Sequence, residues 1–391
     1  MNDILRKPAE GKTPDSSAEC CDHSALPGSI TASCCGGPVK PGIPETYFIS
    51  GAANTAAGPV PRVTGELSSQ DRWGSVKCRW GIGRMSYTVT PGLYALGSPD
   101  ADAPVLVTAN YKMSFDKLRE AMRGWDAWIL VLDTKGINVW CAAGAGTLGT
   151  KELVRRIEQS RLAEVVNHRV LILPQLGAPG VAAHEVKKAS GFKVRYGPIR
   201  AADLPAFLEA GMKATQEMRR KTFPLRERAE LIPIELTPAL KISVPLGMAF
   251  FFLGGLGSVA GYWPGVRHSG FLAVWALLLA VLGGAILFPV LLPWISGRAF
   301  SLKGFFLGLV MDIILWFFLG SGFVLLPGRL ELWAWMFIIP ALVSHIAMNF
   351  TGASTYTSLS GVKKEMRWAL PLQIGGAIIG LALWVGARVI H

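Results

Sequence analysis

A segment of small residues around Cys141 contains the residue types that are most able to do chemistry. It runs from Gly136 to Thr150 and includes a Gly-x-Gly pair, Gly144 and Gly146. The full dinucleotide fingerprint and the Walker A lysine motif are missing from it, which argues against a phosphate-binding loop. The small residues after Cys141 would let a flat, bulky group approach the backbone, and a thiolate is both a nucleophile and a ligand for metals. A buried, inert cysteine is the alternative interpretation.

The elements that would position Cys141 are alternating strands and helices. Continuous apolar runs predict buried strands at Pro104–Ala109, Ala127–Asp133 and Arg169–Leu173. Helical patterns such as Thr150–Val166 separate them, and this order is typical of a parallel sheet in an α/β domain. Because ligands bind at the carboxyl ends of such strands, Cys141 is expected at the ligand-binding edge. Further strands are predicted at Met85–Thr90, Gly92–Gly97 and Phe192–Tyr196, and further helices at Ser114–Arg123, Val181–Ser190 and Ala201–Thr215.

The composition separates a polar first part from an apolar second part. The chain has 391 residues, of which 51% are hydrophobic and 17% charged, and this excludes an intrinsically disordered protein and argues against a simple soluble one. The net charge is +12, but only three acidic residues lie in the last 151 positions. Five apolar stretches there are each long enough to cross a bilayer, at about 242–263, 271–295, 303–326, 332–353 and 368–389.

These patterns predict four parts of the chain and an orientation in the membrane. The parts are a disordered, cysteine-containing tail (1–72), an α/β domain (73–215), a basic juxtamembrane linker (216–240) and a five-span domain (241–391). The cations of the linker can bind anionic headgroups, and with a membrane segment following them no nucleic-acid partner is expected. The excess of cations on one side predicts a multi-pass protein of the cytoplasmic (inner) membrane, with the first domain inside and the C-terminus outside.

The residues around Cys141 resemble a known family. The run Asn138-Val-Trp-Cys-Ala-Ala-Gly144 closely resembles the cap-helix motif of the mercury-methylation corrinoid proteins, and is similar to the corrinoid-binding domain of the large subunit of the corrinoid iron–sulfur protein of the acetyl-CoA pathway. The resemblance continues through Pro174–Gly180 and Val194–Pro198. The five apolar stretches and the run Asn349–Val362 favour the mercury-methylation family in particular, and the likeness covers roughly residues 75–391.

The resemblance implies a fold, a cofactor and a reaction. The fold is an α/β Rossmann-like corrinoid-binding domain followed by an all-α five-helix transmembrane domain. Cys141 would be the lower axial ligand of cobalt in a cobalamin-type corrinoid, since thiolates are soft donors and axial ligands tune a metal's reactivity. The enzyme would be a methyltransferase that passes a methyl group from the cobalt to Hg(II), giving methylmercury. A ferredoxin-like [4Fe–4S] protein is the implied electron donor, and a methyl-folate route the implied methyl source.

Further corrinoid contacts are expected where the predicted strands end, with ordinary caps and turns as the alternative. The expected contacts besides Cys141 are Thr108, Asn110, Asn138, Val139, Trp140, Ala142, Ala143, Gly144, Gly146, Thr147, Gln175, Leu176, Gly177, Ala178, Pro179, Gly180, Tyr196, Gly197 and Pro198. One residue departs from the family pattern, because Ala145 stands where the family usually has lysine. Cobalt ligation by Cys141 does not need that lysine.

Two further groups of residues carry hypotheses of their own. The cysteine pairs could capture Hg(II), because thiolates select soft ions, and their spacing does not suit a zinc site; a dispensable tail is the alternative. The four cysteines are Cys20, Cys21, Cys34 and Cys35. Asp312 and His345 lie within predicted spans, where ionisable residues are costly, and are expected to pair; separate polar partners are the alternative.

Two other functions stay open at this point. The first is a membrane-bound corrinoid methyl carrier of one-carbon metabolism with an acceptor other than mercury. The second is a transporter or sensor whose soluble domain binds a ligand.

Overall fold

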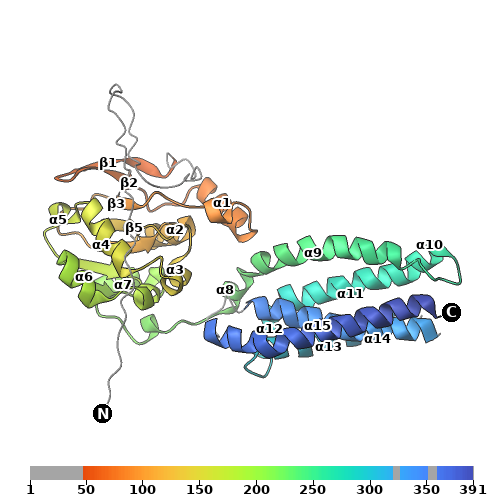
Figure 1. The fold of residues 1–391 in the computed structure, drawn as a ribbon. Helices are drawn as coiled ribbons and strands as arrows, with labels where there is room; N and C mark the ends of the chain where they lie inside the picture. The colour runs from red at the N-terminus through yellow and green to blue at the C-terminus, as the bar shows by residue number, and fades with distance from the viewer. Residues whose placement is uncertain (1–46, 320–325, 351–358, 391) are drawn as a thin grey trace, which may run out of the picture. The chain divides into compact units, whose positions relative to one another are not determined.

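The computed structural model describes residues 47–319, 326–350 and 359–390, and its fold is drawn in Figure 1. Within these residues an α/β domain is followed by a helical region, and the two are described separately below. Cys20, Cys21, Cys34 and Cys35 lie outside the described residues, so the mercury-capture hypothesis for them stays a prediction.

Seven strands in the described part of the chain form one mixed sheet. They are β1 (Ile49–Thr55), β2 (Gly58–Val63), β3 (Gly92–Leu96), β4 (Val105–Ala109), β5 (Ala127–Leu132), β6 (Val170–Leu173) and β7 (Lys193–Tyr196), in the order β1-β2-β3-β5-β4-β6-β7. Strands β5, β4, β6 and β7 run parallel to one another, and β3 is antiparallel to β5. Every residue of β4 and β5 is buried, as expected for parallel strands covered on both faces.

Helices cover both faces of this sheet. They are α1 (Ser69–Arg79), α2 (Lys112–Ala121), α3 (Val139–Ala145), α4 (Thr150–Gln159), α5 (Leu162–Val165), α6 (Ala183–Ser190) and α7 (Leu204–Glu209), with short 3₁₀ turns η2 (Arg84–Ser86), η3 (Gln175–Gly180), η4 (Ala201–Asp203) and η5 (Glu217–Arg219). On one face, Phe115 of α2 and Phe207 of α7 share an apolar core with the sheet. On the other, Leu153 of α4 and Val186 of α6 do the same. The apolar runs predicted as buried strands are therefore the centre of a three-layer domain.

The predicted tail over residues 1–72 is wrong for its last part, because β1 and β2 belong to the sheet. Two prolines in β2 obscure the strand pattern, since proline cannot donate to a ladder. They are tolerated because Pro59 and Pro61 pair only with β1, whereas β2 meets β3 only at Arg62 and Val63.

Three other predicted elements differ from the structure. The strand predicted at Met85–Thr90 is instead the turn η2 and a single bridge from Thr88 to Tyr111. The helix predicted at Thr150–Val166 is divided into α4 and α5 at Arg161, which has a positive φ of 48°. The helix predicted at Ala201–Thr215 is shorter and consists of η4 and α7.

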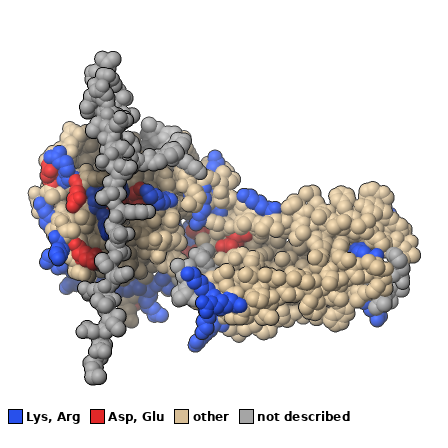
Figure 2. Space-filling model, in the orientation of Figure 1, with Lys and Arg blue, Asp and Glu red and all other residues tan. Residues whose placement is uncertain are grey.

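The helical region contains five helices, among the described residues, that are long and apolar enough to cross a membrane: Leu225–Leu253, Tyr262–Leu291, Phe300–Phe318, Gly328–Asn349 and Gly361–Val389. They are built from α8 (Leu225–Ala229), α9 (Ile232–Leu253), α10 (Tyr262–Gly265), η6 (Val266–Gly270), α11 (Phe271–Val281), η7 (Leu282–Leu287), α12 (Phe288–Leu291), α13 (Phe300–Leu319), α14 (Leu326–Asn349) and α15 (Leu359–Val389). On the face shown in Figure 2, the middle of this region displays no charged side chains. The expected fold class, an α/β domain followed by five apolar helices, is confirmed.

The two ionisable residues predicted within the spans do not pair. His345 Nδ1 lies 3.2 Å from Gln373 Oε1, and Gln373 Nε2 donates to Ser344 Oγ at 2.8 Å. Asp312 is buried on α13, and among the described residues no ion pair joins it to His345. The pairing hypothesis is therefore wrong, because α15 supplies the polar partner of His345.

Candidate functional site

Cys141 lies in the first turn of α3, just beyond the carboxyl end of β5. Asn138 is the N-cap of this helix, and its Oδ1 accepts a hydrogen bond from the Cys141 backbone N–H at 3.0 Å. The helix ends at Gly146, whose φ of +80° suits glycine. The cap at one end and the glycine at the other hold Cys141 on a short, well-defined helix at the edge where ligands bind in parallel sheets.

The surface around the Cys141 side chain is open and low. Cys141 is exposed, whereas Ala142 and Ala143 are buried and fasten the other side of α3 to the domain. A Cβ atom added at Gly144 or Gly146 would meet nothing within 4 Å. No long side chain stands at Gly144 or Gly146, next to the exposed Cys141 thiol. Such a surface would fit a flat macrocycle whose metal takes one ligand from the protein.

The donor set around Cys141 also suits such a macrocycle. Among the described residues there is no group of three or more His, Cys, Asp or Glu that could hold a metal ion. A corrinoid would bring most of the cobalt's donors in its own ring and would need one ligand from the protein, which the exposed Cys141 thiol can supply.

Asn110, one of the expected cofactor contacts, fixes the loop that leads to α3. Its Oδ1 accepts hydrogen bonds from Thr134 N at 3.1 Å, Thr134 Oγ1 at 2.8 Å and Gly136 N at 3.1 Å. Asn110 and Thr108 are both buried, Thr108 within β4, so neither side chain is exposed to a ligand at this edge. Gly136 needs to be glycine, because it has a φ of +73° and an added Cβ would lie 2.9 Å from Thr88 Cγ2.

The structure brings α3 and η3 together, as the expected site requires. A Cβ atom added at Gly180 would lie 2.0 Å from Leu148 O and 3.1 Å from Ala143 Cα, so glycine allows the two segments to touch. Gly177 makes a similar close approach to Leu148 Cδ2. The segments Asn138–Thr147 and Gln175–Gly180 are thus in contact, although three of the expected cofactor contacts within them, Ala142, Ala143 and Gly177, are buried.

The expected contacts after β7 lie at the same edge but are largely occupied by internal hydrogen bonds. Tyr196 Oη donates to Val181 O at 2.8 Å, and Gly197 N donates to Leu173 O at 2.8 Å. Gly197 and Pro198 are buried. Tyr196 therefore holds the end of η3, and Gly197 holds the end of β6, through these hydrogen bonds.

Three polar residues at this edge were not predicted as site residues. Asp133 directly follows β5, and its Oδ2 lies 2.6 Å from Lys135 Nζ. Burial alone would raise the pKa of Asp133, but the side chain and backbone N–H of Lys135 hold it below its usual range. Arg219, predicted to lie in the linker, donates to Gln175 Oε1 at 2.8 Å. The position of Asp133 after a strand is a usable sequence signal, whereas no local signal links Arg219 to a residue 44 positions away.

The alternative interpretation of Cys141, a buried and inert cysteine, fits Cys78 instead. Cys78 is fully buried, and its Sγ lies 3.1 Å from Tyr111 Oη. Burial raises the pKa of the Cys78 thiol, which disfavours the reactive thiolate. Of the two cysteines that the structure describes, Cys141 is the one that can meet a ligand.

Replacing Asn110 by Ala is expected to destabilise the α/β domain by about 2–4 kcal/mol, because two buried backbone donors in the Thr134–Gly136 loop lose their acceptor. Urea unfolding of the full chain in detergent measures this change; the other five cysteines are replaced by Ser, so that a thiol reagent follows the exposure of the buried Cys78 alone. Asn167→Ala is the matched control: Asn167 is exposed, and its replacement should change stability by less than about 0.5 kcal/mol. Equal effects of the two substitutions would contradict the role given to Asn110.

Replacing Gly180 by Ala is expected to cost about 1–3 kcal/mol of stability, because the new methyl group overlaps the Leu148 carbonyl and pushes η3 away from α3. The same unfolding assay measures the loss. Gly144→Ala should have the opposite sign, since open space surrounds that position and alanine favours a helix by about 0.5–1 kcal/mol. A Gly180→Ala chain as stable as the parent would show that η3 and α3 are not in tight contact.

Part of the α/β domain is similar to a known protein family. Residues 81–208 match the family model of the CO dehydrogenase/acetyl-CoA synthase delta subunit. The match begins before β3 and ends in α7, so it contains β3–β7, α3 and η3.

Individual relatives agree with this match. The acetyl-CoA decarbonylase/synthase complex subunit gamma of Methanopyrus kandleri is 33% identical over 135 residues, which are 34% of this chain and 29% of the relative. The subunits of the same name from Archaeoglobus fulgidus and Methanothermobacter thermautotrophicus are 31% and 30% identical over 128 residues, 32% of this chain and 27% and 28% of those relatives. The chain thus covers less than a third of the length of these relatives.

The matches agree with the expected likeness to the acetyl-CoA-pathway protein, and they support a corrinoid as the cofactor of this domain. The family-model match ends at residue 208, before the helical region. The finer likeness to the mercury-methylation proteins stays a prediction.

Proposed function

We propose that this chain is a membrane-anchored corrinoid protein that carries a methyl group, with Cys141 as the lower axial ligand of the cobalt. The observation that carries the proposal is the exposed Cys141 thiol on α3, at the carboxyl edge of the parallel strands and inside the segment that matches the acetyl-CoA synthase family. A bound corrinoid supplies a cobalt ion that can accept a methyl group and pass it on.

The residues around Cys141 would orient and support this group. Asn138 and Gly146 fix the ends of α3, and with them the direction of the Cys141 side chain. Gly144 and Gly146 would leave room for the ring, and the surface of η3 would border it.

Mercury is the second candidate acceptor, and a specific observation favours it. The α/β domain is followed in the same chain by five candidate spans, and the family-model match ends at residue 208, before the first of them. Together with the Asn138–Gly144 motif, this arrangement is what the mercury-methylation resemblance predicts. Under this proposal Hg(II) is the substrate, a ferredoxin-like [4Fe–4S] protein supplies electrons and a methyl-folate-linked protein supplies the methyl group.

The proposal includes a location. The excess of cations on the linker side supports an α/β domain in the cytoplasm, five helices in the inner membrane and a C-terminus outside. The C-terminal residue His391 lies outside the described residues.

Retention of cobalamin by the purified full chain tests the proposal. The chain is incubated in detergent with hydroxocobalamin, passed over a sizing column and examined for the visible absorbance of cobalt corrinoid. Co-elution is the expected result; a chain that retains none would favour a transporter or sensor with a different ligand. Methyl-loaded protein is then offered Hg(II) in the presence of a reduced ferredoxin-like protein, and the formation of methylmercury decides between the two acceptors.

A further inference from the structure

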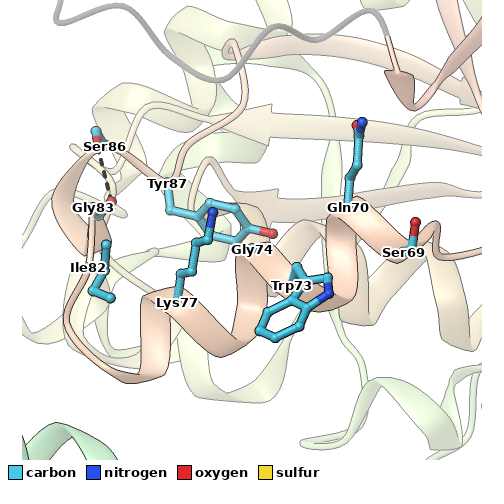
Figure 3. A pocket seen from close by; sticks show the side chains of 9 residues that line it. All are labelled: Ser69, Gln70, Trp73, Gly74, Lys77, Ile82, Gly83, Ser86 and Tyr87. Atoms are coloured by element: carbon cyan, nitrogen blue, oxygen red, sulfur yellow. Dashed lines mark hydrogen bonds between the residues drawn. The ribbon is translucent and has the colours of Figure 1, made fainter.

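An apolar and basic patch covers the outer face of α1 and the turn that follows it. We call this surface the α1 patch; its apolar members are Trp73, Val76, Trp80, Ile82 and Met85, and its cations are Arg72, Lys77 and Arg84. The five apolar side chains are between 39% and 68% exposed, which is unusual for residues of this size in the middle of a folded domain. In Figure 3, Trp73 and Lys77 project from successive turns of α1, and Ile82 follows on the next turn of the chain. Of the patch residues, Trp73, Lys77 and Ile82 border a cavity of about 710 Å³.

The helical part of the patch lies on a single face of α1. Trp73, Val76 and Trp80 stand at positions i, i+3 and i+7, which share one side of a helix. The other side of α1 is fastened to the domain: Asp71 lies 2.6 Å from Lys112 Nζ, and Tyr87 Oη donates to Asp71 O at 3.2 Å. The patch is therefore held rigidly outward.

The charges of this segment are one-sided. Residues 69–86 contain four cations and a single acidic residue, Asp71, which is buried. Arg79 pairs with Glu230 at 2.9 Å, but no ion pair between the described residues joins Arg72 or Lys77 to a carboxylate, so the outer face of α1 presents indoles, aliphatic side chains and positive charge. Tryptophan and long cations together are the residue types that favour the headgroup region of an anionic bilayer.

A bilayer lies within reach of the α/β domain by the length of the chain alone. Met218 still packs against the core of this domain, the helix of the first candidate span begins at Leu225, and the last acidic residue of that helix is Glu235. The seven residues to Leu225 extend over at most about 25 Å, and the helix from there to Glu235 adds about 15 Å. A lipid surface is therefore the apolar and anionic partner that this chain itself keeps close to the domain.

We propose that the α1 patch docks on the surface of an anionic lipid bilayer. Docking would fix the orientation of the α/β domain relative to the membrane. It would also place the turn at Met85–Thr88, which lies against Gly136 of the loop before α3, beside the headgroups. The proposal is independent of the cofactor and of the methyl acceptor.

A fluorescent probe in the full chain tests this proposal. Cys20, Cys21, Cys34, Cys35 and Cys141 are replaced by Ser, the buried Cys78 is retained, and a polarity-sensitive probe is attached through Ile82→Cys. Lys188→Cys is the matched control, because Lys188 is exposed on α6, before β7 and at the other end of the sheet. Each labelled chain is placed in vesicles of phosphatidylcholine with or without phosphatidylglycerol, together with a lipid that carries a quencher near its headgroup.

We expect the probe at position 82 to shift to shorter wavelength and to be quenched several-fold more than the probe at position 188, and only in vesicles that contain phosphatidylglycerol. Arg72→Glu with Lys77→Glu should abolish the difference, while an unreactive Cys78 shows that the domain remains folded. Equal quenching at the two positions, or quenching that does not depend on phosphatidylglycerol, would overturn the proposal. Shielding of position 82 that requires an added protein would overturn it in favour of a protein-binding surface.

Discussion

Replacing Cys141 by Ala is expected to remove the cobalt ligand that we propose and to reduce methyl transfer by more than about 100-fold, since even the loss of a partner that only supports a metal ligand costs about 10–100-fold. The visible spectrum of the cobalamin-loaded chain should change at the same time, because the axial ligand sets the electronic state of the metal. Cys141→Ser should behave like Cys141→Ala, since a hydroxyl is a much weaker and harder donor than a thiolate.

Ala145→Ser provides the control for this experiment. Ala145 is exposed at the last position of α3, so the new hydroxyl lies near Cys141 but replaces no proposed ligand. It should leave the spectrum unchanged. A Cys141→Ala chain with the parental spectrum would show that Cys141 does not ligate the cobalt, whatever its methyl-transfer activity.

The strands that position Cys141 could be predicted from the sequence because parallel strands are covered on both faces. Such strands read as unbroken apolar runs, and Val105–Ala109 and Ala127–Leu132 are buried at every position. Strand β1 has no such signature, because most of its residues are exposed or half-buried and it lies at the edge of the sheet. The position of Cys141 after the strand Ala127–Leu132 could therefore be predicted from the sequence, whereas the number of strands in the sheet could not.

The contacts that hold the candidate site in place could not be predicted from the sequence in the same way. The hydrogen bonds that Asn110 accepts come from residues 24 and 26 positions away, and neither end carries a local pattern that names the other. The same holds for Gly180, whose need for glycine comes from the Leu148 carbonyl. Spacing along the chain predicts which residues share an element, but partners in different elements are decided by the packing of the folded domain.

A buried group of four charges is the clearest case in which the sequence pattern misleads. Lys112, Asp116 and Arg119 have the helical spacing of a solvated face, yet all are buried on α2. Lys112 Nζ lies 2.6 Å from Asp71 and 2.5 Å from Asp116, and Arg119 lies 2.7 Å and 2.8 Å from the same two carboxylates. Arg119 also donates to the carbonyls of Thr64 and Glu66, so the group joins α2 to α1 and to the chain that follows β2.

Replacing Lys112 by Met is expected to lower the free energy of unfolding of the α/β domain by about 3–5 kcal/mol, because it leaves one buried carboxylate without compensation. This is a large part of the total stability of an ordinary domain, about 5–15 kcal/mol. Urea unfolding of the full chain in detergent, followed by the exposure of Cys78 at the end of α1, measures it. The control is Arg123→Met, since Arg123 pairs with Glu66 on the surface and its loss should cost less than about 1 kcal/mol.

The double substitution Lys112→Met with Asp116→Leu separates charge balance from packing. It removes one cation together with one anion and leaves Asp71 paired with Arg119 at 2.7 Å. If the uncompensated charge causes the loss, the double variant should recover most of the 3–5 kcal/mol, as replaced buried ion pairs in other proteins do. A double variant less stable than Lys112→Met alone would show instead that the shape of the Lys112 and Asp116 side chains holds α1 and the chain after β2 against α2.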